Sequence, residues 1–201
     1  MQQNLILDIS RITKKLLIND IFYGLFISSI EKKESKNIPL AAVGLNKNTM
    51  EFSLLINPDE WFKYSDQVKY NLLKHECLHL TNFHLITMDM FPNSKIDNIA
   101  CDIEINQNCD KSNLPEWGCF IDDFEKKYPK LNWKKHAGRK HYYNELNKLS
   151  DKEKEELGIN EKAKHIWTVV DGEGNPSNEP LSEAQKDAIR VQIEHTIESI
   201  A

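Results

Sequence analysis

The sequence predicts an α+β protein, in which a small antiparallel β-hairpin or sheet lies beside a mostly helical body. Most of the chain repeats apolar residues at the three-to-four-residue spacing of amphipathic helices. Two short apolar runs lack that spacing and are joined by Asn46-Lys47-Asn48, which favours a hairpin because asparagine tolerates a positive φ. The 201 residues are enough for one domain with a buried core, and 40% of them are hydrophobic, as in ordinary globular proteins.

The N-terminal third is expected to hold two apolar helical segments, a linker and the hairpin. Apolar residues recur at helical spacing from Leu5 to Leu17, and a second apolar segment runs from Ile21 to Ile30. The charged run 31–36 is expected to be a solvated linker. The two strands are predicted at Pro39 to Leu45 and at Met50 to Ile56.

The rest of the chain is predicted to be mainly helical, with helix-start signals before each apolar pattern. These helices are expected to begin at Asn57-Pro58, at Ser65-Asp66 (running to about Met88), near Ser94-Lys95, at His141 (running to Leu149), and at the capping box of Ser182 with Gln185. The other segments are expected to be a loop-rich region from Lys111 to Trp133, a strand within Lys162 to Val170, and a loop from Asp171 to Pro176.

Charge and hydropathy exclude several classes of function. The formal net charge is −5 and the basic residues are spread along the chain, which disfavours an electrostatic nucleic-acid binder. No stretch reaches the ~18 apolar residues of a membrane helix, and residues 1–8 lack the features of a secretory signal. We therefore expect a cytoplasmic protein that binds neither membrane nor nucleic acid.

The cysteines show no metal-binding spacing. Cys77, Cys101, Cys109 and Cys119 include no C-x-x-C pair, so a structural zinc knuckle is disfavoured. In a reducing compartment they are expected to be free thiols. Cys77 and Cys101 lie inside apolar helical patterns and are expected to be buried.

The segment His75-Glu76-Cys77-Leu78-His79 carries the chemistry. On a helix, His75 and His79 are one turn apart on one face, so their imidazoles can converge on one Zn²⁺ ion. Glu76 points to the side of that face, where its carboxylate can accept a proton from a zinc-bound water that attacks a carbonyl. The alternative is a helix that holds two histidines by chance.

A catalytic zinc needs a third protein ligand, and the sequence offers two candidates. Asp102 lies on the next predicted helix, with Asn106 one turn later as a possible partner of its carboxylate. His84 is turned roughly 140° from His79 on a regular helix, and could ligate only if the helix broke within residues 81–83. Asp102 is favoured, and His84 stays open.

Several ordered blocks resemble a predicted metal-dependent peptidase family of bacteria and bacteriophages, in which a von Willebrand A-like domain often follows the peptidase domain. The resemblance covers roughly residues 9–149. The blocks are Arg11 to Leu17, Phe22 to Leu25, Leu55 to Pro58, His75 to His79 with His84, Asn98 to Asn106, Leu114 to Glu116, and Tyr143 to Leu146. One departure is Phe83, where the family often has glycine, and this makes a helix break there less expected.

The resemblance implies a zincin-like metallopeptidase domain at residues 1–150, with His75, His79 and Asp102 as metal ligands and Glu76 as the base. Residues 151–201 are then an extension that ends in a helix, too short for a von Willebrand A-like domain, either by nature or because the chain is cut. The expected function is hydrolysis of a peptide or protein substrate, and the resemblance implies that it takes place in a bacterial cell or a phage-infected host. The alternative is a zinc-binding but catalytically idle scaffold or interaction module.

Three aromatic residues are candidate proton donors to the oxyanion that forms when water adds to the substrate carbonyl. They are His141, Tyr142 and Tyr143, which lie together on a predicted helix. Contacts within the core are the simpler role for them. The sequence names neither the substrate nor the oligomeric state.

Overall fold

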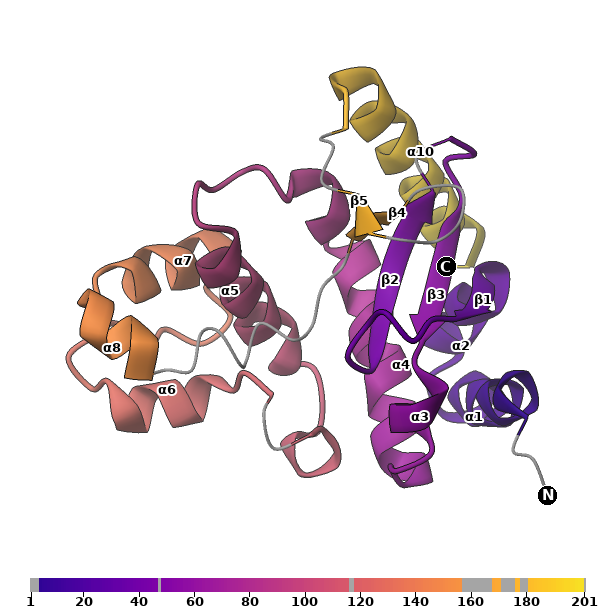
Figure 1. The fold of residues 1–201 in the computed structure, drawn as a ribbon, viewed down its shortest axis with the longest axis horizontal. Helices are drawn as coiled ribbons and strands as arrows, with labels where there is room; N and C mark the ends of the chain where they lie inside the picture. The colour runs from indigo at the N-terminus through magenta and orange to yellow at the C-terminus, as the bar shows by residue number, and fades with distance from the viewer. Residues whose placement is uncertain are drawn as a thin grey trace. The chain divides into compact units, whose positions relative to one another are not determined.

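A computed structural model describes residues 4–46, 48–115, 118–156, 168–170, 176–177 and 181–200, and it confirms the α+β class. The predicted strand over Lys162 to Val170 is described from Thr168 on, where a strand is present. Its first part and residues 171–175 of the predicted loop lie outside the described residues, and Pro176, the last residue of that loop, lies in a short strand. Contacts divide the chain into two compact units (Figure 1).

Unit 1 comprises residues 1–87 and 166–201. Unit 2 comprises residues 88–165. The last helix therefore groups with the N-terminal part of the chain. The domain boundary near residue 150 that the sequence favours is a different division, and it stays a prediction.

Unit 1 holds the sheet and most of the long helices (Figure 1). Its elements are α1 (Leu5–Asn19), α2 (Ile21–Ser29), β1 (Glu31–Glu34), β2 (Ala41–Asn46), β3 (Phe52–Ile56), α3 (Pro58–Trp61), α4 (Asp66–Thr81), the 3-10 helix η1 (His84–Thr87), β4 (Thr168–Val170), β5 (Pro176–Ser177) and α10 (Glu183–Ile200). The capping box of Ser182 with Gln185 opens α10 as predicted.

Among the described residues, five strands form one mixed sheet in the order β1-β3-β2-β4-β5. The predicted hairpin is β2 and β3, which pair antiparallel, while β1 pairs with β3 and β4 with β2 in parallel. In the turn, the side chain of Asn46 accepts hydrogen bonds from the backbone of Asn48 and Thr49. Every residue of β3 is buried, so both faces of this strand are covered.

Residues 31–34 correct one expectation. They form β1, an edge strand, where the sequence predicts a solvated linker. The run Glu-Lys-Lys-Glu has no apolar alternation, and its place in the sheet comes from main-chain pairing with β3. Charged side chains on an edge strand discourage pairing with another molecule, which accounts for the composition of this strand.

Helix α4 is packed on several sides. It contacts β2 as well as α1 and α2, and α10 contacts both α4 and η1 (Figure 1). Because neighbours surround it, most residues in its second half are buried, polar ones included. These surroundings fix the backbone on which His75, Glu76 and His79 lie.

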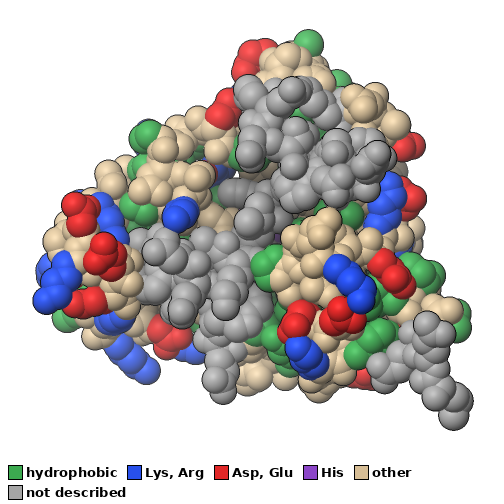
Figure 2. Space-filling model, in the orientation of Figure 1, with side chains coloured by type: hydrophobic (Ala, Val, Ile, Leu, Met, Phe, Trp, Pro, Cys, Tyr) green, Lys and Arg blue, Asp and Glu red, His purple; other side chains and the backbone are tan. Residues whose placement is uncertain are grey.

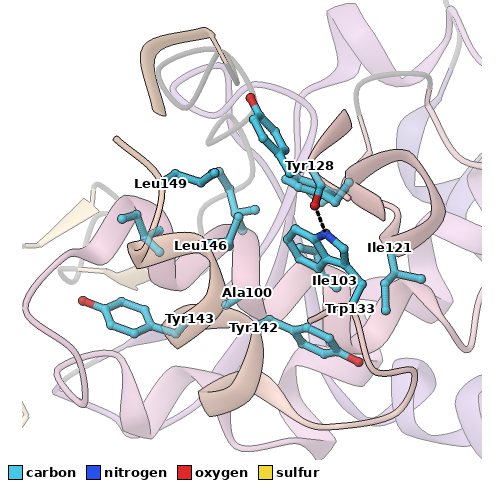
Figure 3. Packing of buried hydrophobic residues seen from close by; sticks show 13 residues of the cluster. Ala100, Ile103, Ile121, Tyr128, Trp133, Tyr142, Tyr143, Leu146 and Leu149 are labelled. Atoms are coloured by element: carbon cyan, nitrogen blue, oxygen red, sulfur yellow. Dashed lines mark hydrogen bonds between the residues drawn. The ribbon is translucent and has the colours of Figure 1, made fainter. Parts of the chain in front are cut away.

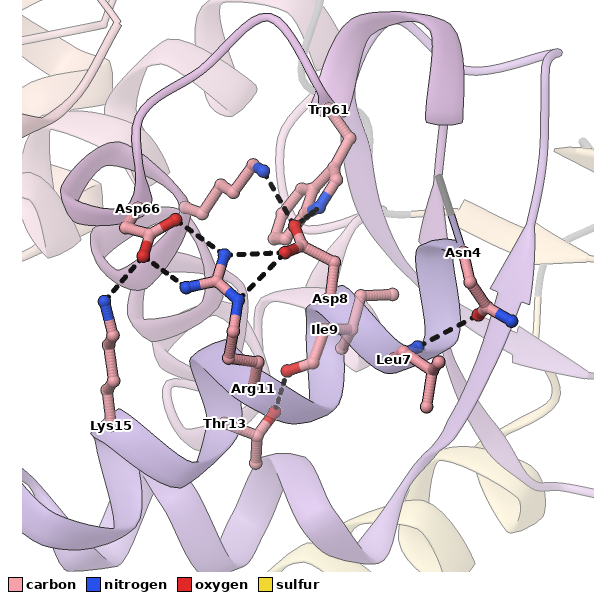
Figure 4. Close-up of polar contacts among 10 residues, drawn as sticks. Asn4, Leu7, Asp8, Ile9, Arg11, Thr13, Lys15, Trp61 and Asp66 are labelled. Atoms are coloured by element: carbon pink, nitrogen blue, oxygen red, sulfur yellow. Dashed lines mark hydrogen bonds and ion pairs between the residues drawn. The ribbon is translucent and has the colours of Figure 1, made fainter. Parts of the chain in front are cut away.

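A network of charged side chains ties α1 to α3 and α4 (Figure 4). The Asp8 carboxylate accepts hydrogen bonds from Trp61 Nε1 at 2.9 Å, Lys69 Nζ at 2.7 Å and Arg11 at 2.6 Å. Arg11 also pairs with Asp66. Burial raises the pKa of Asp8, but the hydrogen bonds from Lys69, Arg11 and Trp61 outweigh it, so the pKa lies below its ordinary value.

We expect Asp8→Asn to lower the free energy of unfolding at pH 7 by about 2–3 kcal/mol, because it takes the anion away from the buried ammonium of Lys69. The lowered pKa of Asp8 means that its contribution is complete above the unfolded pKa of about 3.9 and is lost as pH falls further. The difference from wild type in urea unfolding should therefore shrink below about pH 4. Asp187→Asn, which breaks an exposed pair with Arg190, is the control. Equal effects of the two substitutions at pH 7 would contradict this account.

Unit 2 consists of helices that pack around one hydrophobic core (Figure 3). Its elements are α5 (Ser94–Asn106), the 3-10 helix η2 (Lys111–Asn113), α6 (Ile121–Lys127), α7 (Arg139–Asn147) and α8 (Asp151–Glu156). Helix α5 packs against α7, and the core between and around them includes Ile99, Ile103, Phe124, Trp133 and Tyr142. The indole Nε1 of Trp133 donates to the carbonyl oxygen of Tyr128 at 2.8 Å.

A buried ion pair joins the same two helices. The Arg139 guanidinium donates from Nε to Oδ1 of Asp97 at 2.6 Å and also pairs with Oδ2, and both side chains are buried. A two-pronged contact of this kind fixes orientation as well as distance. It sets the rotation of α5, the helix that carries Asp102.

On the face drawn in Figure 2, acidic and basic side chains of the described residues are interspersed. Among the helices that the structure describes, none is long and apolar enough to span a bilayer.

Candidate metal centre

The motif residues lie on α4, the helix that the sequence predicts to carry them, and in its second half because the helix ends at Thr81. The helix begins at the cap Ser65, whose Oγ accepts from the backbone nitrogen of Val68. His75, Glu76 and His79 are 4%, 0% and 2% exposed. Polar groups are buried at a cost unless they are bound or hydrogen-bonded, so this part of α4 is built around interactions of these side chains.

The two imidazoles converge. Nε2 of His75 lies 3.0 Å from Nε2 of His79, with the ring planes at 78° to each other. Two nitrogen ligands of one tetrahedral zinc lie about 3.3 Å apart, because each Zn–N bond is about 2.0–2.1 Å long. The distance between the two Nε2 atoms is therefore close to what a shared metal ion requires.

Asp102 completes a set of three. Among the described residues, His75, His79 and Asp102 each offer a ligand atom within 4.8 Å of the others, and all three are buried. Two imidazoles and a carboxylate can hold a divalent metal ion, and they match the number and kind of protein ligands at catalytic zinc sites. The donor atoms alone leave the identity of the metal open. His84 is not a member of this set.

Helix α4 ends earlier than the sequence predicts. It stops at Thr81 and not near Met88, and Phe83 adopts φ 57, in the left-handed region. That conformation costs an L-residue roughly 1–2 kcal/mol, which is why glycine is the usual residue there. The chain accepts it because η1 then buries Leu85 and Ile86, which are 1% and 2% exposed.

This break brings His84 back to the site. Its Nδ1 lies 3.0 Å from Nδ1 of His79, and the residue is 1% exposed. The sequence presents His84 either as a metal ligand or as a residue outside the site. The structure shows a third arrangement, in which His84 contacts Nδ1 of His79, the ring nitrogen that does not face His75. Asn82, a residue common near helix ends, was the only local signal for the break.

Asn106 has a partner of its own. Its Nδ2 donates to the carbonyl oxygen of Cys119 at 2.9 Å, which ties the end of α5 to the segment that precedes α6. A contact of Asn106 with the Asp102 carboxylate stays a prediction. Both residues are almost fully buried on α5.

The three aromatic residues on α7 have structural contacts. The Tyr142 hydroxyl donates to the Lys134 carbonyl at 2.9 Å and accepts from Gln107 and Ala137. The Tyr143 ring stacks on Phe91 at 4.1 Å between centroids, and Nε2 of His141 lies 2.6 Å from the carbonyl oxygen of Asn132. These contacts favour structural roles for the three side chains.

The comparisons with known proteins add no relative. No protein-family profile, curated protein or solved structure matches this chain. The likeness to the predicted peptidase family therefore stays an expectation, carried by the motif residues themselves.

Proposed function

We propose that this protein is a zinc-dependent hydrolase that cleaves peptide bonds in peptides or proteins. One observation carries the proposal. The buried set of His75, His79 and Asp102 can hold a metal ion, and a buried glutamate, Glu76, directly follows the first histidine on α4.

The donor atoms fit the proposed metal. His75 and His79 would supply imidazole nitrogens and Asp102 a carboxylate oxygen, a combination suited to zinc, which takes nitrogen and oxygen donors. Three protein ligands leave a coordination position for a reactant. Bound there, zinc would supply Lewis acidity, which polarises a carbonyl and lowers the pKa of water.

Glu76 is the proposed general base. Its carboxylate accepts the proton of the attacking water as the new C–O bond forms at the carbonyl carbon. The same carboxyl then gives that proton to the amide nitrogen as the C–N bond breaks, so the amine leaves in neutral form. One group thus serves both steps, and no further acid is needed for the balance of protons.

Burial supports a second candidate, a zinc-binding scaffold without catalysis. The three proposed ligands and Glu76 are at most 4% exposed, and structural zinc sites are closed in this way. A scaffold has no use for a glutamate base beside the first ligand, and Glu76 is therefore the residue that separates the two candidates.

Zinc removal tests the hydrolase. Wild-type protein should cleave members of a mixed-sequence peptide library, lose that cleavage on treatment with a chelator, and regain it with Zn²⁺ but not with Mg²⁺, which prefers oxygen ligands. Mass spectrometry of the products measures this and locates the broken bonds. Cleavage that continues in the chelator would contradict a metal-dependent mechanism. Zinc-loaded protein that cleaves nothing would favour the scaffold.

A further inference from the structure

The ring of His79 lies between two other histidines, all within unit 1. Its Nε2 faces Nε2 of His75 at 3.0 Å, and its Nδ1 faces Nδ1 of His84 at 3.0 Å. The ring of His84 is inclined at 68° to that of His79, with centroids 5.1 Å apart. Each nitrogen of His79 thus has one histidine neighbour.

The proposed zinc site determines which nitrogen of His79 carries the proton. A neutral imidazole has one N–H and one lone pair. If Nε2 gives its lone pair to the metal with His75, the proton lies on Nδ1. The atom that faces this proton is Nδ1 of His84, which can accept it only if the proton of His84 is on its own Nε2.

We propose that His84 is a positioning residue of the metal centre. Its Nδ1 accepts the Nδ1–H of His79, which fixes the tautomer and the rotation of the His79 ring and places the lone pair on Nε2, the nitrogen that would bind zinc. This inference rests on the proposed function only in that it needs the metal, and it holds for a scaffold as well as for a hydrolase. Ligand histidines commonly use a carboxylate or a carbonyl for this purpose, and here the acceptor is a second imidazole.

The backbone holds His84 for this role. The break after Thr81 and the left-handed Phe83 redirect the chain, and the hydroxyl of Thr87 donates to the Phe83 carbonyl at 2.9 Å. The neighbours Leu85 and Ile86 anchor η1 in the core. A side chain held by packing on a short rigid turn keeps its acceptor in place, as a positioning group requires.

Two variants of similar size separate the loss of the hydrogen-bond acceptor at position 84 from a change in packing. His84→Asn keeps an oxygen at the position of Nδ1, whereas His84→Leu puts a methyl group there. We expect zinc affinity, measured by competition with a chromophoric chelator, to fall about 10–100-fold in His84→Leu. It should stay near the wild-type value in His84→Asn. His195→Leu, at an exposed position on α10, is the control for loss of a histidine.

Each other outcome overturns the inference. Equal affinities for wild type and both variants would show that His84 does not act on the site. Equal losses in both variants would assign the effect to packing. A much larger loss in both, with a changed coordination number in the visible spectrum of the Co²⁺ form, would make His84 a ligand. If wild type binds no zinc, the proposed function and this inference fail together.

A measurement on wild type covers the case in which a variant does not fold. In ¹⁵N-labelled, zinc-loaded protein, the ring-nitrogen chemical shifts should show Nδ1 of His79 protonated and Nδ1 of His84 unprotonated. A protonated or metal-bound Nδ1 on His84 would overturn the inference without any substitution.

Discussion

Glu76→Gln should lower the rate of peptide hydrolysis by about 10²–10⁴-fold, the usual effect of losing a general base. The amide has the size of the carboxylate but cannot take up the proton of water. Because the two side chains have the same size and Glu76 is not one of the proposed ligands, the variant should keep both its fold and its metal. The measurement is initial cleavage rate at equal zinc occupancy, on a peptide that wild type cleaves.

A matched control separates the loss of the base from a general effect of replacing a glutamate with glutamine. Glu60→Gln changes the same atoms on a partly exposed residue of α3, where the carboxylate pairs with Lys63. Its hydrolysis rate should equal that of wild type. A Glu76→Gln protein that cleaves as fast as wild type would show that Glu76 is not the base. Loss of zinc in the variant would instead place Glu76 among the ligands.

The elements of the fold were predictable wherever the signal is local. The hairpin of β2 and β3 follows from two short apolar runs and the turn residues between them, and the starts of α4 and α5 follow from caps such as Ser65 and Asn93. The strand β1 and the end of α4 were not predictable from local signals. The strand β1 depends on backbone pairing with β3, and the end of α4 depends on the burial of Leu85 in the core.

The same distinction between local and non-local signals applies to the candidate site. The spacing of His75 and His79 on one helix face is a local property, so the convergence of their rings could be expected from the sequence. The contact between His79 and His84 could not, because it depends on the left-handed conformation of Phe83, which a bulky residue rarely adopts. The pair of Asp97 with Arg139, 42 positions apart, has no local signal either.

His79→Ala should abolish tight zinc binding, the second large effect that we expect. The substitution removes one of three proposed ligands and leaves two, fewer than a stable zinc site in a protein provides. Metal that binds only the folded protein stabilises it, by about 4 kcal/mol when free zinc is 1,000 times its dissociation constant. We therefore expect zinc to raise the unfolding midpoint of wild type and not that of His79→Ala.

Asp102→Asn tests the third ligand by the same measurement. It preserves the shape of the side chain but removes the charge that zinc favours, so zinc should raise its unfolding midpoint much less than that of wild type. His195→Ala, at an exposed site on α10, is the control and should respond to zinc as wild type does. A full zinc response in Asp102→Asn would remove Asp102 from the proposed ligand set.

Elemental analysis of purified wild-type protein tests the central claim most directly. The set of His75, His79 and Asp102 predicts about one zinc ion per chain, and a parallel sample of His79→Ala should contain almost none. Wild-type protein without stoichiometric metal, and without affinity for added zinc, would contradict the account.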